Sequence, residues 1–161
     1  MEIEIKIKEA YKIACLGATN EEWLFLGIES LLNFDFKISK NCFMKIKDMK
    51  LINLANEVEE EKLNGTDFNV LRGIIYSNIG KYKRASDFFI KGGKPEKSQE
   101  MYATLKMYAQ ALEIRGKYMK GYDNIYSDEI LCEQAEWLNK NKKFKESAEL
   151  YRALGKKKKS Y

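Results

Sequence analysis

The chain has 161 residues, of which 45% are hydrophobic and 33% charged, and it contains one proline and no histidine. This composition is typical of a globular protein and excludes disorder, because a chain of this length buries most of its apolar surface on folding. The formal net charge of +5 depends largely on four lysines at 156–159, so the remaining chain lacks the basic stripe that a nucleic-acid backbone requires.

The cysteines and the N-terminal residues indicate the cellular compartment of the protein. Cys15, Cys42 and Cys132 are odd in number and widely separated, so they form neither a disulfide framework nor a CxxC pair. The first residues alternate charged and apolar side chains, which does not match a secretory signal. No apolar run approaches the roughly 20 residues of a membrane span. We therefore expect a reduced, intracellular protein.

Helical periodicity and capping residues divide the first half of the chain. Gly17 ends a first helix, and Thr19 with Glu22 forms a capping box that opens the second. Asp35 and Asp48 stand at the starts of the next two, where the helix dipole favours a negative charge. The pattern predicts helices over residues 5–16, 19–33, 35–47 and 48–62.

Glycines and the single proline mark the breaks in the second half. The Asn64-Gly65 pair is a turn, Gly80 ends a helix, and Gly92-Gly93 breaks the chain before Pro95 opens the next helix. Residues 121–127 are expected to form a loop. The pattern predicts helices over residues 66–79, 82–90, 95–105, 107–119, 128–139 and 142–154.

A sequence repeat recurs in the return helices, the second helices of the predicted antiparallel pairs. It begins with an aromatic ring, followed by a small residue three positions after that ring, a second ring seven positions after it, and a small or apolar residue ten positions after it. These positions share one helical face, so the small residue admits a partner helix between the rings. A fourth, degenerate copy begins at Tyr108 and Ala111 but has Arg115 in place of the second ring. The three full copies are Phe36, Ser39, Phe43, Ile46; Tyr82, Ala85, Phe89, Gly92; and Phe144, Ser147, Tyr151, Leu154.

The segment 78–82, followed by Ala85 and Phe89, resembles the turn and second helix of the tetratricopeptide repeat. The copies are irregularly spaced, which favours a divergent array. We therefore predict an all-α, tetratricopeptide-like α-solenoid of about ten antiparallel helices, with one domain over 1–155 and a basic, flexible tail at 156–161. The expected structural repeat core is Trp23, Phe36, Ser39, Phe43, Tyr82, Ala85, Phe89, Tyr108, Ala111, Trp137, Phe144, Ser147 and Tyr151.

Residues for catalysis are scarce. The absence of histidine removes the commonest general base and metal ligand, and no Gly-rich phosphate-binding motif or nucleophile elbow occurs. The segment 92–95 is interpreted as a helix-ending turn, and the acidic run 57–61 as a solvated surface instead of a divalent-ion site. The cysteines are expected to fill core space. We predict no catalytic, cofactor-binding or metal-binding residue, and no enzyme.

The two tryptophans admit two readings. Trp23 and Trp137 have the size and polarity of partner anchors, but both lie on apolar helix faces. The core is the favoured location for both.

A family resemblance covers nearly the whole chain. The segment 9–17, followed by Thr19 and Trp23, is similar to the region after the propellers in the 122-kilodalton subunit family of intraflagellar transport complex A. The similarity continues in order through Leu31, residues 34–36, 45–48, 80–82, 100–102 and 134–137. The paired WD-repeat propellers that precede this region in the family are absent here.

The resemblance implies a helical-repeat scaffold at the cilium and basal body, on the cytoplasmic side. It implies contacts with other subunits of complex A, a part in retrograde transport, and indirect delivery of ciliary membrane proteins. A vesicle-coat or general tetratricopeptide adaptor is the alternative. An RNA-binding repeat protein is disfavoured because the repeat lengths vary too much for a regular base-reading array.

Overall fold

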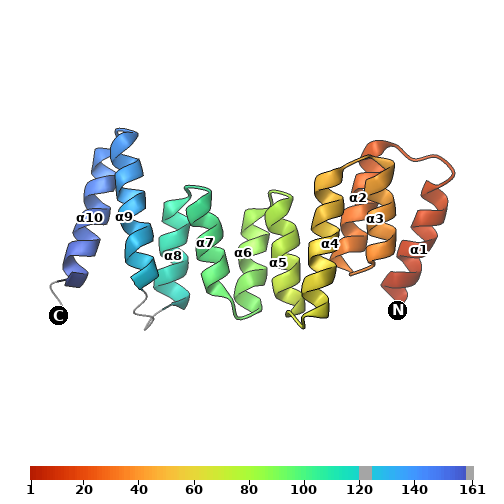
Figure 1. The fold of residues 1–161 in the computed structure, drawn as a ribbon, viewed down its shortest axis with the longest axis horizontal. Helices are drawn as coiled ribbons and strands as arrows, with labels where there is room; N and C mark the ends of the chain where they lie inside the picture. Colours follow the sequence, from red (N-terminus) through yellow and green to blue (C-terminus); the bar gives the residue numbers. More distant parts are fainter. Residues whose placement is uncertain (120–124, 159–161) are drawn as a thin grey trace. The chain divides into compact units, whose positions relative to one another are not determined.

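The computed structural model describes residues 1–119 and 125–158, with the side chains of residues 1–119 and 131–152. The described residues form ten α-helices and no strand, which confirms the predicted fold class. The helices are α1 (Glu2–Ala14), α2 (Asn20–Leu32), α3 (Phe36–Lys45), α4 (Met49–Leu63), α5 (Phe68–Asn78), α6 (Tyr82–Lys91), α7 (Pro95–Thr104), α8 (Tyr108–Tyr118), α9 (Ile125–Lys140) and α10 (Phe144–Lys158) (Figure 1).

Two predicted boundaries near the C-terminal end are wrong. Helix α9 already begins at Ile125, so residues 125–127 are helical and not part of a loop; the rest of that predicted loop lies outside the described residues. Helix α10 continues to Lys158, so residues 156–158 of the expected tail are helical. Lysine is a good helix former and its charge suits a helix C-terminus, which favours this extension.

The chain divides into two compact units, residues 1–94 and 95–161. The division falls after Gly92 and Gly93, where α6 ends. It differs from the prediction of one domain over 1–155.

The turns inside the helical pairs share one backbone geometry. Phe34, Gly80, Lys106 and Lys142 have positive φ values of 63°, 83°, 61° and 59°, each two residues before the next helix. The following amide donates a hydrogen bond back across the helix end, as from Asp35 to Ser30 (2.9 Å) and from Lys81 to Tyr76 (2.9 Å). This is the Schellman arrangement, and it satisfies carbonyls that a helix end otherwise leaves without a partner. The two helices of each pair consequently turn back on one another (Figure 1).

The main core of the first unit lies among α2, α3, α4 and α5. Its members are Leu31, Leu32, Phe43, Leu54, Ala55, Val58, Leu71 and Ile75, and a second cluster joins Ile7 of α1 to Trp23, Leu26, Ile38 and Cys42. Helix α4 lies between the α2–α3 and α5–α6 pairs in the sequence and contributes side chains to this core. The extra helix explains the long interval between the first two repeat copies.

Glycines on the first helices of the α2–α3 and α5–α6 pairs allow the second rings of the repeat to approach. A Cβ atom built on Gly27 lies 2.5 Å from the Phe43 ring, and one built on Gly73 lies 2.6 Å from the Phe89 ring. A third close approach joins Gly92 to Val70, at 2.6 Å from the valine methyl group. In these places the helix pairs pack at backbone distance, where a larger side chain has no space.

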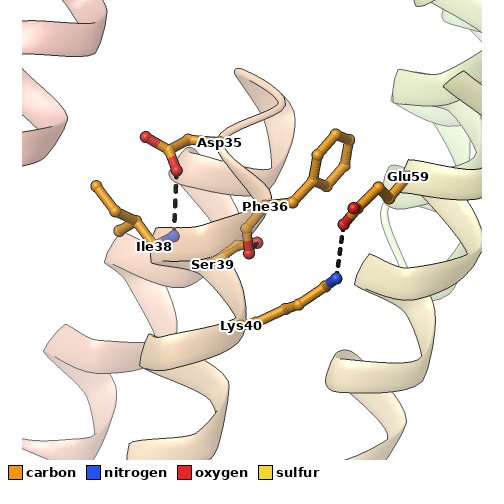
Figure 2. A network of polar contacts seen from close by, with 6 residues as sticks. All are labelled: Asp35, Phe36, Ile38, Ser39, Lys40 and Glu59. Atoms are coloured by element: carbon orange, nitrogen blue, oxygen red, sulfur yellow. Dashed lines mark hydrogen bonds and ion pairs between the residues drawn. The ribbon is translucent and has the colours of Figure 1, made fainter. Parts of the chain in front are cut away.

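A partly buried ion pair joins α3 to α4. Lys40 Nζ lies 2.6 Å from Glu59 Oε2, as Figure 2 shows. On the same turn of α3, the Ile38 amide donates to Asp35 Oδ1 (3.1 Å) and the Ser39 hydroxyl donates to the Phe36 carbonyl (3.0 Å). Asp35 therefore caps α3, and the expected acidic residue at that helix start is confirmed.

The second unit has a smaller core. Tyr108, Leu131, Ala135, Leu138 and Leu150 form one cluster, with Leu112 and Trp137 packed at its edge. The Ser147 hydroxyl donates a buried hydrogen bond to the Ala135 carbonyl (2.8 Å), which ties α10 to α9. The small residue of the repeat is thus a contact point between the paired helices.

Candidate interaction surface

Most residues of the predicted repeat core are inside the protein. Phe36, Tyr82 and Trp137 are partly buried. Eight further residues of the predicted repeat core are buried: Trp23, Ser39, Phe43, Ala85, Phe89, Tyr108, Ala111 and Ser147.

The rings of the last repeat copy are not in the core. Phe144 is 61% exposed and Tyr151 is 46% exposed, so their predicted burial is wrong. The equivalent rings of α3 pack on a cluster that includes side chains of α4 and α5. Neither Phe144 nor Tyr151 belongs to the apolar cluster that α10 forms with α8 and α9. The side chain of Leu154, the last position of this copy, lies outside the described part.

The cysteines differ in their surroundings. Cys42 is fully buried in α3, as expected for a core filler, but Cys15 and Cys132 are exposed, which contradicts that expectation. Burial, and to a smaller degree the neighbouring Cys15, raises the pKa of the Cys42 thiol to about 11. Burial and the nearby Cys15 also raise the pKa of Tyr11. Cys42 is therefore a neutral packing group at physiological pH.

The acidic run of α4 serves local structure. Glu59 pairs with Lys40, and Glu61 accepts a hydrogen bond from the Thr66 hydroxyl (2.8 Å). Within the described residues, no group of three or more histidine, cysteine, aspartate or glutamate side chains is arranged to hold a metal ion. The segment 92–95 ends α6 and begins α7, with Gly93 at φ 74°, which confirms its interpretation as a turn.

Trp23 and Trp137 differ in burial. Trp23 is buried and makes an edge contact with Tyr11, at 5.9 Å between ring centroids. Trp137 is partly exposed, and its edge contact with Tyr108 has a centroid distance of 5.7 Å. Trp137 therefore packs on the core and also presents apolar surface outward. It has features of both a core residue and an exposed partner anchor, the two interpretations of the tryptophans in the sequence.

A groove of about 420 Å³ opens beside Trp137. We call it the α8–α10 groove, because α8, α10 and the end of α9 supply its walls. The larger apolar side chains of its lining are Met107, Tyr108, Leu112, Trp137, Leu138 and Leu150.

Charged side chains border the α8–α10 groove in two groups. Lys106 and Lys143 lie in the two turns that precede α8 and α10, whereas Glu146 and Glu149 project from the first turns of α10. Within the described part of the chain, none of these four groups forms an ion pair. No sequence motif connects the residues of this groove, because they come from three helices and two turns.

A second, more polar hollow of about 320 Å³ shares Lys106 and Tyr108 with the groove. Gln134 lines it, and the buried Gln134 Oε1 accepts no hydrogen bond from the described residues. None of the described helices combines the length and apolarity needed to cross a bilayer.

Paired antiparallel helices, repeated small-residue contacts and an apolar groove with a charged rim define a tetratricopeptide-like helical-repeat protein. A family model described as IFT122, TPR domain, matches residues 3–161. The chain belongs to this family, which confirms the resemblance found in the sequence.

Similar proteins carry the same family name. The chain is 30% identical over 149 residues to the intraflagellar transport protein 122 homolog of Xenopus tropicalis, 31% to that of Homo sapiens and 29% to that of Danio rerio. Each comparison covers 92% of this chain and 12% of the relative. The chain therefore corresponds to a small part of each relative's length.

Proposed function

We propose that the chain acts as a non-enzymatic protein-interaction scaffold in intraflagellar transport, as part of a complex A subunit. The observation that carries the proposal is the family match over residues 3–161, joined to relatives named for intraflagellar transport. A repeated helical fold suits this role, because each helix pair is fixed by its neighbours and leaves other faces available to partners.

The proposed partners are other subunits of complex A. Through that complex the chain supports retrograde transport and, indirectly, the ciliary delivery of membrane proteins. Its proposed location is the cilium or flagellum and the basal body, on the cytoplasmic side.

Co-purification from ciliated cells tests this function. The tagged full-length protein that carries this segment is isolated under mild conditions, and its partners are identified by mass spectrometry. We expect other subunits of complex A at comparable abundance, and a fluorescent fusion along the cilium and at its base. Recovery of vesicle-coat subunits without complex A subunits would overturn the proposal and favour the adaptor alternative.

A further inference from the structure

We propose that the α8–α10 groove binds one amphipathic helix of a partner protein. The acidic C-terminal end of that helix lies over Lys106 and Lys143, its apolar side chains contact Trp137 and Leu112, and its basic N-terminal end faces Glu146 and Glu149. This inference rests on the proposed scaffold function and specifies the chemistry of one partner.

The size and lining of the groove suit apolar side chains. Its volume of about 420 Å³ is within the range of roughly 300–1,000 Å³ that is usual for binding pockets. Trp137 and Tyr108 are ring types that often supply binding energy in protein interfaces. Trp137 is only partly buried, so it retains apolar surface to bury against a partner.

Charge gives the groove a direction. The lysine end also holds the N-termini of α8 and α10, where the helix dipole places partial positive charge. Met107, which precedes α8, makes no side-chain hydrogen bond, and Lys143, which precedes α10, carries no acceptor that could cap the helix. Both lysines and both dipoles therefore attract negative charge at the same end.

The opposite charges lie further along α10. Glu146 and Glu149 are three residues apart, so they lie on the same helical face, about one and two turns beyond Lys143. A helix is the occupant that fits this pattern, because its own dipole places partial negative charge at its C-terminus, toward the lysines. Apolar side chains at helical spacing then fill the space above Trp137.

Two designed peptides test the direction. Both have about three helical turns, blocked termini and leucines at helical spacing, so their first and last turns lie about two turns apart, as Lys143 and Glu149 do along α10. The forward peptide carries lysines in its first turn and glutamates in its last, and the reversed peptide has these charges exchanged. The reversed peptide is the better helix former alone, so a preference for the forward peptide does not come from intrinsic helicity.

Calorimetric titration of the 161-residue chain measures both affinities. We expect the forward peptide to bind at least about tenfold more tightly, a difference of about 1.4 kcal/mol. The Lys106→Glu, Lys143→Glu double variant makes both ends of the groove acidic and should abolish this preference, whereas Lys140→Glu, an exposed change outside the groove lining, should leave it unchanged. Ala109→Phe places a ring in the groove from an exposed lining position and should abolish binding of both peptides.

Equal affinity of the native protein for the two peptides, or no binding of either, would overturn the inference. Unchanged peptide binding by the Ala109→Phe variant, with a native circular-dichroism spectrum, would also overturn it. So would a proline-containing peptide that does not form a helix but binds as tightly as the forward peptide. The co-purification experiment is independent of these titrations. If the protein assembles with complex A but shows no peptide preference, the groove inference is overturned and the proposed function stands. If it shows the peptide preference but does not assemble with complex A, the proposed function is overturned and the binding property of the groove stands.

Discussion

Gly73 of α5 lies directly against the ring of Phe89 in α6, so close that a Cβ atom at residue 73 would be 2.6 Å from two ring carbons. Gly27 and Phe43 repeat this relationship at the same sequence separation in the α2–α3 pair. The repeat is therefore a property of two helices at once. In these two pairs, the second ring of the repeat requires a residue without a side chain on the first helix.

Replacing Gly73 by alanine should destabilise the first unit. The added methyl group meets a buried ring, and overpacking of this kind costs about 1–3 kcal/mol, against a gain of up to about 1 kcal/mol from helix propensity. We expect a net loss of up to about 2 kcal/mol in the free energy of unfolding, measured by urea denaturation.

Two further variants give the control. Phe89→Leu in combination with Gly73→Ala should recover part of the loss, because the two residues share one contact. Gly116→Ala in α8 adds a methyl group with no neighbouring atom within 4 Å, so it should be neutral or stabilising. Equal effects of Gly73→Ala and Gly116→Ala would contradict the proposed contact.

The second rings of two repeat copies should differ sharply in their effect on stability. Phe43→Ala removes a fully buried ring and should cost about 3–5 kcal/mol. Tyr151→Ala removes a ring at the matching position that is 46% exposed, and should cost less than about 1 kcal/mol. Thermal and urea unfolding measure both; a large loss in Tyr151→Ala would show that this ring is buried in solution.

The helices could be predicted from the sequence because each carries its own signals. The Thr19 and Glu22 capping box is present with both hydrogen bonds, at 3.3 Å and 2.7 Å, and Asp35, Asp48 and Asp67 cap the helices that follow them. The buried small residues Ser39 and Ala85 followed from helical spacing alone. Local chemistry of this kind acts within one turn and is readable in a single segment.

The turns and the groove could not be predicted in the same way. Phe34 occupies a left-handed conformation that glycine usually takes. Its ring packs on Phe68, with a centroid distance of 5.2 Å, beneath the charged ends of Lys62 and Arg72. These contacts join α4 and α5 to the turn and depend on tertiary structure. The exposure of Phe144 and Tyr151 likewise depends on which helices surround α10.

The ion pair between Lys40 and Glu59 should contribute modestly to the stability of the first unit. A double-mutant cycle with Lys40→Ala and Glu59→Ala should give a coupling energy of about 0.5–1 kcal/mol, which falls at high salt, since both side chains are partly exposed to solvent. The exposed pair of Lys8 with Glu4 within α1 is the control, with an expected coupling of about 0.3–0.5 kcal/mol. Zero coupling for Lys40 and Glu59 at low salt would contradict the expected contribution of this ion pair to stability.

The buried thiol of Cys42 should react far more slowly than the two exposed thiols. At pH 8 iodoacetamide should label Cys15 and Cys132 readily, because both are exposed, and should leave Cys42 unlabelled until the protein unfolds. With a pKa raised to about 11, Cys42 is also almost entirely in the unreactive thiol form at that pH. Peptide mass spectrometry after timed labelling gives the order, and early modification of Cys42 would contradict its burial in α3.

The same thiol should make stability depend on alkaline pH. The folded state keeps the Cys42 proton up to about pH 11, whereas the unfolded chain releases it near pH 9, so the folded state binds more protons in this window. The stabilising effect is complete below pH 9 and is lost as the pH rises toward 11. Urea unfolding of the native protein and of Cys42→Ala at pH 8 and pH 10 measures it. At pH 8 the Cys42→Ala variant should be less stable than the native protein, because the smaller side chain leaves a small cavity. Its free energy of unfolding should nevertheless fall less between pH 8 and pH 10. An identical fall in both proteins would show that Cys42 ionises equally in the folded and unfolded states.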